Sequence, residues 1–118
     1  MENFKKINVY AKDKAGMVQK FEFEHSSHSL ERASQRGINN NRLSVALAYG
    51  ELIQKQGLEF HILGENRIPD EFEKEKQKLK NTVVVTIRDC VITCYRAKDP
   101  YKQIKKKSKV FYTQRMAA

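Results

Sequence analysis

The chain has 118 residues, the usual size of one domain, and its 40% hydrophobic and 31% charged residues are typical of a globular rather than a disordered protein. No run approaches the roughly 18 consecutive apolar residues of a transmembrane helix, and the first residues lack the long apolar region of a secretory signal. We therefore expect no membrane association and a cytoplasmic location, in a bacterial or phage-infected host cell.

The net charge of +9 indicates a polyanionic partner, either a nucleic acid or an acidic protein surface. Two cysteines, Cys90 and Cys94, are fewer than small secreted domains usually carry, and no second Cys or His pair follows at ligand spacing. We interpret both as small apolar strand residues and expect neither a metal site nor a cofactor.

The first two predicted elements are strands over residues 4–10 and 17–24, joined by a polar turn. Phe21 and Phe23 alternate with Glu22 and Glu24, the period of two that is typical of a strand. The two segments predict an N-terminal hairpin.

Two helices are expected next. Ser26 and Ser27 are N-cap residues before a helix over residues 28–36, which Gly37 ends. The asparagines at 39–41 precede a second helix with apolar residues at helical spacing, which ends at Gly50.

The second half of the chain predicts four more strands. Short strands are expected over residues 51–54 and 58–63, and stronger ones over 82–88 and 91–96, which should form an antiparallel hairpin at the centre of the sheet. A charged stretch over 70–80 predicts an exposed helix that only Phe72 and Leu79 can anchor. The fold class is α+β, with one domain over residues 1–98 and a basic C-terminal extension over 99–118.

The first predicted helix carries a candidate catalytic stripe. His28, Arg32 and Arg36 follow one another at intervals of four, so they lie along one helix face. Imidazole transfers protons near neutral pH, and guanidinium groups bind phosphate. RNA cleavage without a metal needs both functions, whereas the alternative is a solvated basic helix face.

The last predicted strand adds further candidates. Thr93 and Tyr95 share one face of it, and Cys94 and Arg96 share the other. A hydroxyl, a phenol and a guanidinium near the strand end can complete a phosphate site, although the same pattern fits an ordinary half-buried strand. Candidate nucleic-acid-binding residues are Arg96, Lys102, Lys105, Lys106, Lys107 and Lys109.

The segment from Ser27 to Arg32, followed by Arg36-Gly37-Ile38, resembles the signature of a family of short, poorly characterised phage and bacterial proteins. That family shows Ser-x-His-Ala, an Arg four residues after the His, then Arg-Gly-Ile and a hairpin ending near Thr-x-Tyr. The similarity to that family covers roughly residues 25–96. The family itself resembles the barnase–EndoU–colicin–RelE superfamily, which includes metal-independent ribonucleases and many toxins.

The resemblance implies N-terminal strands and a helix pair packed on one face of an antiparallel sheet. It also implies a site made of His28, Arg32, Arg36, Thr93 and Tyr95, with RNA as the ligand and an antitoxin as a possible partner. Ser29 stands where the family has Ala, and residues 64–81 are an insertion relative to the family pattern.

Three alternatives stay open. His25 near His28 suggests a two-histidine acid–base pair, while His61 is expected on the polar face of a strand. The spacing of Ala33, Gly37 and Leu43 matches a DNA-binding helix-turn-helix, although the second helix is too apolar to read bases. A non-enzymatic protein that binds and inhibits a host protein fits the same charge.

Overall fold

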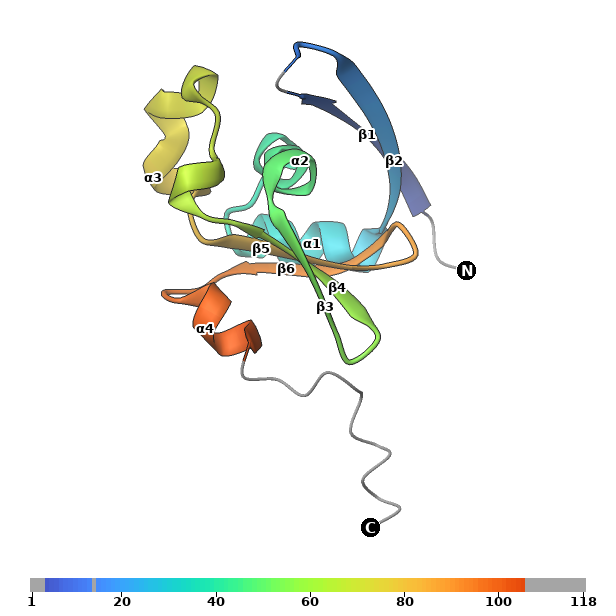
Figure 1. Cartoon of the computed structure of the whole chain (residues 1–118). Helices are drawn as coiled ribbons and strands as arrows, with labels where there is room; N and C mark the ends of the chain where they lie inside the picture. The colour runs from blue at the N-terminus through green and yellow to red at the C-terminus, as the bar shows by residue number, and fades with distance from the viewer. Residues whose placement is uncertain (1–3, 14, 106–118) are drawn as a thin grey trace.

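The computed structural model describes residues 4–13 and 15–105. Six strands form one curled sheet in the order β1-β2-β6-β5-β4-β3, with helices on both sides, so the α+β class is confirmed (Figure 1). The strands are β1 (Phe4–Lys12), β2 (Val18–Ser26), β3 (Glu51–Lys55), β4 (Leu58–Leu63), β5 (Thr82–Ile87) and β6 (Cys90–Arg96). The helical segments are α1 (Ser27–Gln35), α2 (Asn40–Tyr49), η1 (Glu65–Arg67), η2 (Asp70–Glu75), α3 (Lys76–Leu79) and α4 (Pro100–Lys105).

Two antiparallel hairpins confirm the strand predictions. β1 pairs with β2 over their full lengths, from Phe4 opposite Ser26 to Lys12 opposite Val18. β5 and β6 occupy the two middle positions of the sheet and are joined by a tight turn at Arg88 and Asp89. Both turn residues have positive φ, 49° and 66°, the conformation whose twist matches that of the flanking strands.

The expected capping residues set the ends of the two main helices. The Ser26 hydroxyl accepts the backbone N–H of Ser29 at 3.1 Å at the start of α1. The Asn39 side chain likewise accepts the N–H of Arg42 at 2.9 Å at the start of α2. Gly37, with φ at +72°, lies just after α1, where left-handed backbone favours glycine.

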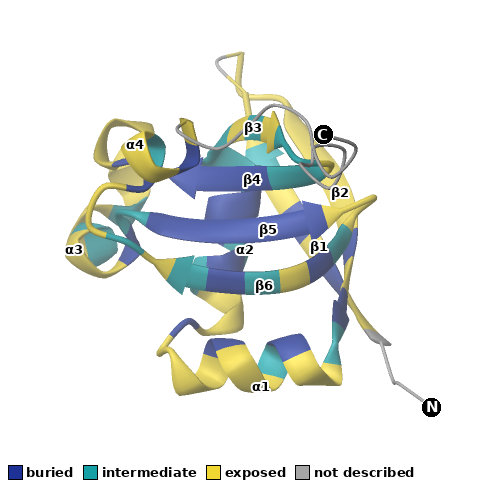
Figure 2. Cartoon of the chain, turned by 90° about the horizontal axis from the view of Figure 1, so that it is seen from below, coloured by how far each residue is buried: buried dark blue, intermediate teal, exposed yellow. Residues whose placement is uncertain are grey.

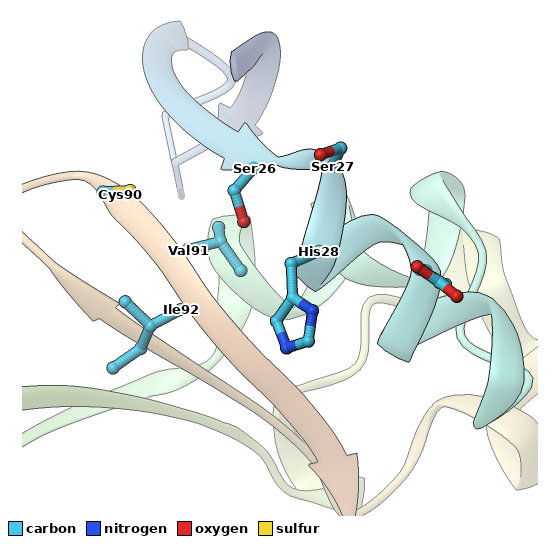
Figure 3. Close-up of a pocket in the computed structure, with 7 residues that line it drawn as sticks. Ser26, Ser27, His28, Cys90, Val91 and Ile92 are labelled. Atoms are coloured by element: carbon cyan, nitrogen blue, oxygen red, sulfur yellow. The ribbon is translucent and has the colours of Figure 1, made fainter. Parts of the chain in front are cut away.

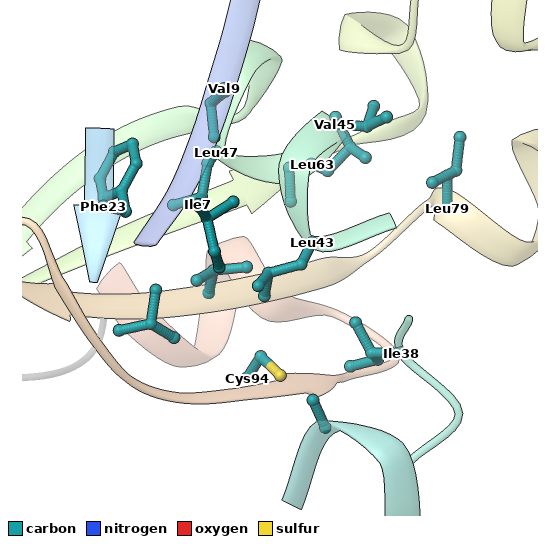
Figure 4. Packing of buried hydrophobic residues seen from close by; sticks show 14 of the residues in the cluster. Ile7, Val9, Phe23, Ile38, Leu43, Val45, Leu47, Leu63, Leu79 and Cys94 are labelled. Atoms are coloured by element: carbon teal, nitrogen blue, oxygen red, sulfur yellow. The ribbon is translucent and has the colours of Figure 1, made fainter. Parts of the chain in front are cut away.

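The sheet separates two apolar clusters. The larger one lies between the sheet and the helices α1 and α2, and Figure 4 shows Ile7 and Phe23 of the first hairpin packed toward Leu43 and Leu47 of α2. The smaller one lies on the opposite face, where Ile104 of α4 packs on β4 and β5. Most of β4 and β5 is therefore buried on both faces (Figure 2).

The prediction of an antiparallel sheet is wrong at one place. Of the five pairings between described strands, four are antiparallel, but β2 runs parallel to β6 through Glu24 opposite Cys90 and His25 opposite Val91. The parallel pairing is short because the chain leaves β2 at Ser26 and enters α1. Beyond Val91, α1 rather than a strand lies beside β6.

The charged stretch at 70–80 does not form the single helix that was expected. It folds as the 3₁₀ segment η2 followed by α3, with a break at Phe72, whose φ and ψ are −105° and 19°. The two expected anchors are correct, since Leu79 is buried and Phe72 packs against the larger cluster. Within the range predicted as a basic extension, residues 100–105 form α4, whose Ile104 is buried.

Candidate functional site

An open hollow of about 590 Å³ lies where α1 begins beside β6. It exists because the β2–β6 pairing stops after two residue pairs and the chain turns into α1. The start of α1 and the start of β6 therefore form its two walls, as Figure 3 shows. The lining residues are Ser26, Ser27, His28, Glu31, Cys90, Val91 and Ile92.

His28 is the proton-transferring candidate that this hollow contains. Its side chain is exposed, and its ring extends from α1 toward β6 between the two walls (Figure 3). Glu31, one helical turn further along the same face, lines the same hollow. An imidazole and a carboxylate are thus both accessible to one bound molecule.

A buried hydrogen-bond network supports the wall beneath this hollow. His25 is fully buried, and its Nδ1 pairs with the hydroxyl of Ser29. The Ser26 hydroxyl lies 3.1 Å from the Ser29 hydroxyl, which also donates to the carbonyl of Ser26 at 3.1 Å. Burial lowers the pKa of His25, which favours the neutral imidazole in the folded protein. His25 thus has a structural setting quite unlike that of the exposed His28.

The two arginines of the expected stripe occupy different settings. Arg32 is exposed on α1. Arg36 crosses to β6, where its Nη1 donates to the Thr93 hydroxyl at 3.1 Å and to the Cys94 carbonyl at 2.8 Å. The structure therefore brings Arg36 and Thr93 together, and Arg36 hydrogen-bonds to the edge of β6 where no strand pairs with it.

Tyr95 and Arg96 lie away from that contact. Tyr95 packs against the smaller cluster on the α4 face, and burial raises its pKa. Arg96 donates to the carbonyls of Gln77 at 2.8 Å and Lys80 at 3.2 Å, around the end of α3. The guanidinium of Arg96 thus holds the 64–81 segment against β6.

The predicted basic residues of the C-terminal region are described only in part. Lys102 and Lys105 are exposed on α4, and the Lys105 ammonium lies 5.7 Å from the centre of the Tyr101 ring. Lys106, Lys107 and Lys109 lie outside the described residues.

The expectation that His61 lies on the polar face of a strand is wrong. Its side chain is only 8% exposed and lies edge-on to the Phe23 ring, with centroids 6.0 Å apart. Its Nε2 bonds to the Thr86 hydroxyl at 2.9 Å, and Thr86 donates to a Glu59 carboxylate oxygen at 2.7 Å. Burial lowers the pKa of His61, although Glu59 and Asp89 oppose that shift.

Both cysteines lie in β6 and form no disulfide. Cys94 is fully buried in the larger cluster, as expected of an apolar strand residue, and Cys90 is half-buried beside the hollow. Within the described ranges, no group of three or more His, Cys, Asp or Glu side chains is placed to hold a metal ion. Over the same ranges, no helix has the length and apolarity needed to cross a membrane.

Two residues of this region were not among the candidates predicted from the sequence. Glu31 lies three residues after His28, and helical periodicity alone places it on nearly the same face. Ser29 is buried and bonds to His25, which its polar character did not suggest.

The comparisons with known proteins find no match to this chain among family models, curated proteins or solved structures. The resemblance to the barnase–EndoU–colicin–RelE superfamily stays a prediction that rests on the quoted motif.

Proposed function

We propose that the protein is an RNA-directed, metal-independent ribonuclease whose active site is the hollow between α1 and β6. The observation that supports this proposal is the position of His28, exposed inside that hollow beside Glu31. The net charge of +9 favours a polyanionic substrate.

The reaction needs two proton transfers. The 2′-oxygen of a ribose attacks the adjacent phosphorus while a base takes its proton, and an acid protonates the departing 5′-oxygen. The products are a 2′,3′-cyclic phosphate and a free 5′-hydroxyl, so the step consumes no water. His28 and Glu31 are the pair that would share these transfers, because both line the hollow.

The phosphate contacts differ from those expected at first. Arg32 is the exposed guanidinium on the same helix and would neutralise the charge on the non-bridging phosphate oxygens in the transition state. Arg36 is already hydrogen-bonded to Thr93 and Cys94, so its main part in the proposal is to position α1 against β6.

The test is cleavage of an end-labelled single-stranded RNA by the full chain in the presence of EDTA. A positioned general acid or base contributes roughly 10²- to 10⁴-fold, so His28→Ala should lower the rate by about that factor. Ser34→Ala changes an exposed residue of the same helix outside the hollow and is the matched control. Intact RNA with the wild-type chain would exclude the ribonuclease, and equal cleavage rates for wild type and His28→Ala would exclude His28 as its acid or base.

A second candidate is a non-enzymatic protein that binds a host protein. The observation that favours it is the tip of the β1–β2 hairpin, where Met17, Val18 and Phe21 are exposed. Such a protein would keep its partner affinity in His28→Ala and lose it when Arg32→Glu reverses a surface charge. A ribonuclease would instead lose activity in both variants.

A further inference from the structure

A second hollow, of about 230 Å³, lies between β1, α2 and η2, away from His28. Three aromatic and three polar side chains contribute to it, from segments far apart in the sequence. They are Tyr10, Tyr49, Phe72, Asn8, Asn41 and Ser44. Phe72 belongs to the 64–81 segment, which therefore builds one wall of this hollow.

Of the three aromatic rings, Tyr49 and Phe72 are held by contacts, whereas Tyr10 is exposed. The Tyr49 and Phe72 rings pack together with centroids 6.3 Å apart and planes 55° apart. The Tyr49 hydroxyl accepts the backbone N–H of Lys12 at 3.2 Å, which joins α2 to β1. Tyr10 is 58% exposed, so its ring is accessible for stacking.

The polar groups of this hollow are available for a ligand. The side chains of Asn8, Asn41 and Ser44 make no hydrogen bond with any other residue in the described ranges. The unpaired edge of β1 adds backbone donors and acceptors to these side chains. The N–H of Lys12 points away from β2, toward Tyr49, and the backbone groups of successive residues along a strand alternate in direction. The N–H and C=O groups of Asn8 and Tyr10 therefore point away from β2 as well.

The charges identify the kind of ligand. None of the described side chains that line the hollow is charged, so the part of the ligand inside it is neutral. On β1, the exposed residues Lys6 and Lys12 flank Asn8 and Tyr10, so a ligand that extends along β1 meets positive charge. On the opposite wall the exposed Glu71 and Glu73 flank Phe72, which directs an anionic chain toward β1. The hollow is also smaller than the roughly 300–1,000 Å³ of pockets for drug-sized ligands, which suits a single ring system.

We propose that this hollow binds one unstacked base of a single-stranded RNA. A base is planar and neutral, carries hydrogen-bond donors and acceptors on its edge, and is joined to phosphates on both sides. Exposed aromatic rings beside basic side chains bind single strands in this way. The inference rests on the proposed function for its choice of RNA, and it adds a base-binding subsite outside the cleavage site.

The experiment is fluorescence anisotropy of the full chain with a labelled single-stranded RNA of about ten nucleotides, within the usual site size of one domain. All proteins carry His28→Ala so that cleavage does not interfere. Base stacking on an aromatic side chain is worth about 5- to 150-fold in affinity, and Tyr10→Ala should weaken binding by such a factor. Asn41→Ala should weaken it too, while Phe21→Ala, an exposed aromatic of the same hairpin outside the hollow, should not.

Three results would overturn the subsite alone. The first is that Tyr10→Ala and Asn41→Ala both bind RNA as tightly as the parent His28→Ala chain. This result would leave the proposed ribonuclease intact, because cleavage by the chain with His28 is measured separately. An equal loss for Tyr10→Ala with an oligomer that lacks its bases would show that Tyr10 contacts the backbone. Displacement of the RNA by nucleoside monophosphates at similar concentrations would assign the hollow to a free nucleotide instead. If the chain binds no RNA at all, both the subsite and the proposed function fail.

Discussion

The guanidinium of Arg36 donates to the hydroxyl of Thr93 over 3.1 Å, although 57 residues separate the two in the sequence. The same Nη1 donates to the Cys94 carbonyl at 2.8 Å, on the stretch of β6 that faces α1 rather than a strand. A side chain thus supplies the donor that a neighbouring strand would otherwise provide. This contact fixes the distance between α1, which carries His28, and β6, which forms the opposite wall of the hollow.

We predict that Arg36→Ala lowers the free energy of unfolding by about 1 kcal/mol, because it removes two hydrogen bonds from a charged donor at a solvent-exposed edge. Arg32→Ala, at an exposed position of the same helix, should change it by less than about 0.5 kcal/mol. Urea denaturation followed by circular dichroism measures both. Equal stabilities of the two variants would mean that the β6 edge does not depend on Arg36.

We predict a larger effect for Ser29→Ala. His25 is fully buried and its Nε2 already lacks a partner in the described structure, so losing the Ser29 hydroxyl would leave both ring nitrogens unpaired. A buried polar group left unsatisfied costs about 1–3 kcal/mol. Ser27→Ala removes an exposed hydroxyl from the same turn and is the control. A loss for Ser29→Ala no greater than the control would show that water reaches His25.

Much of the fold follows from local signals in the sequence. The caps at Ser26 and Asn39 and the glycine at 37 mark the helix ends, and alternation marks the strands. The burial of His25 was also predictable, because it continues the buried side of β2 after Phe23 with the same period of two.

Other features depend on contacts that leave no local pattern. The parallel β2–β6 pairing consists of two residue pairs between distant segments, and no periodicity reports which strands become neighbours. His61 was misplaced because both faces of β4 are buried. The α4 helix covers the face of Phe60 and Ile62, and His61 on the other face packs against Phe23 of the first hairpin. For the candidate site, the helical stripe predicted the position of His28, whereas the position of Tyr95 depends on which cluster each face of β6 meets.

The buried histidines predict a pH dependence of stability. Burial lowers the pKa of both His25 and His61, so folding favours the neutral form of each imidazole. The unfolded chain takes up protons on them below about pH 6.5, the ordinary imidazole pKa. The contribution of these two histidines to the free energy of unfolding should therefore be constant above about pH 6.5. It should decrease as the pH falls below that value.

Urea denaturation at pH values between about 7.5 and 5.5 measures this dependence. His61→Gln keeps a donor near the Thr86 hydroxyl, and His25→Asn keeps a polar atom near Ser29, but neither replacement takes up a proton. The double variant should lose most of the acid-side slope. A slope equal to that of the wild type would assign the effect to other groups.

The two cysteines should differ sharply in reactivity. Burial raises the pKa of the Cys94 thiol to about 11, although the Arg36 guanidinium opposes that shift, and the side chain is fully buried. Because thiolate is the reactive form, a rise in pKa from 9.0 to about 11 lowers the thiolate fraction at pH 8 by roughly a hundredfold. A Cys90→Ala chain, whose remaining thiol is Cys94, should react with a thiol reagent at least that much more slowly when native than in urea. The matched Cys94→Ala chain retains the half-buried Cys90 and should show a much smaller difference between native and unfolded rates.

Fast native labelling of Cys94 would mean that α1 separates readily from β6, since Cys94 lies in the cluster beneath that helix.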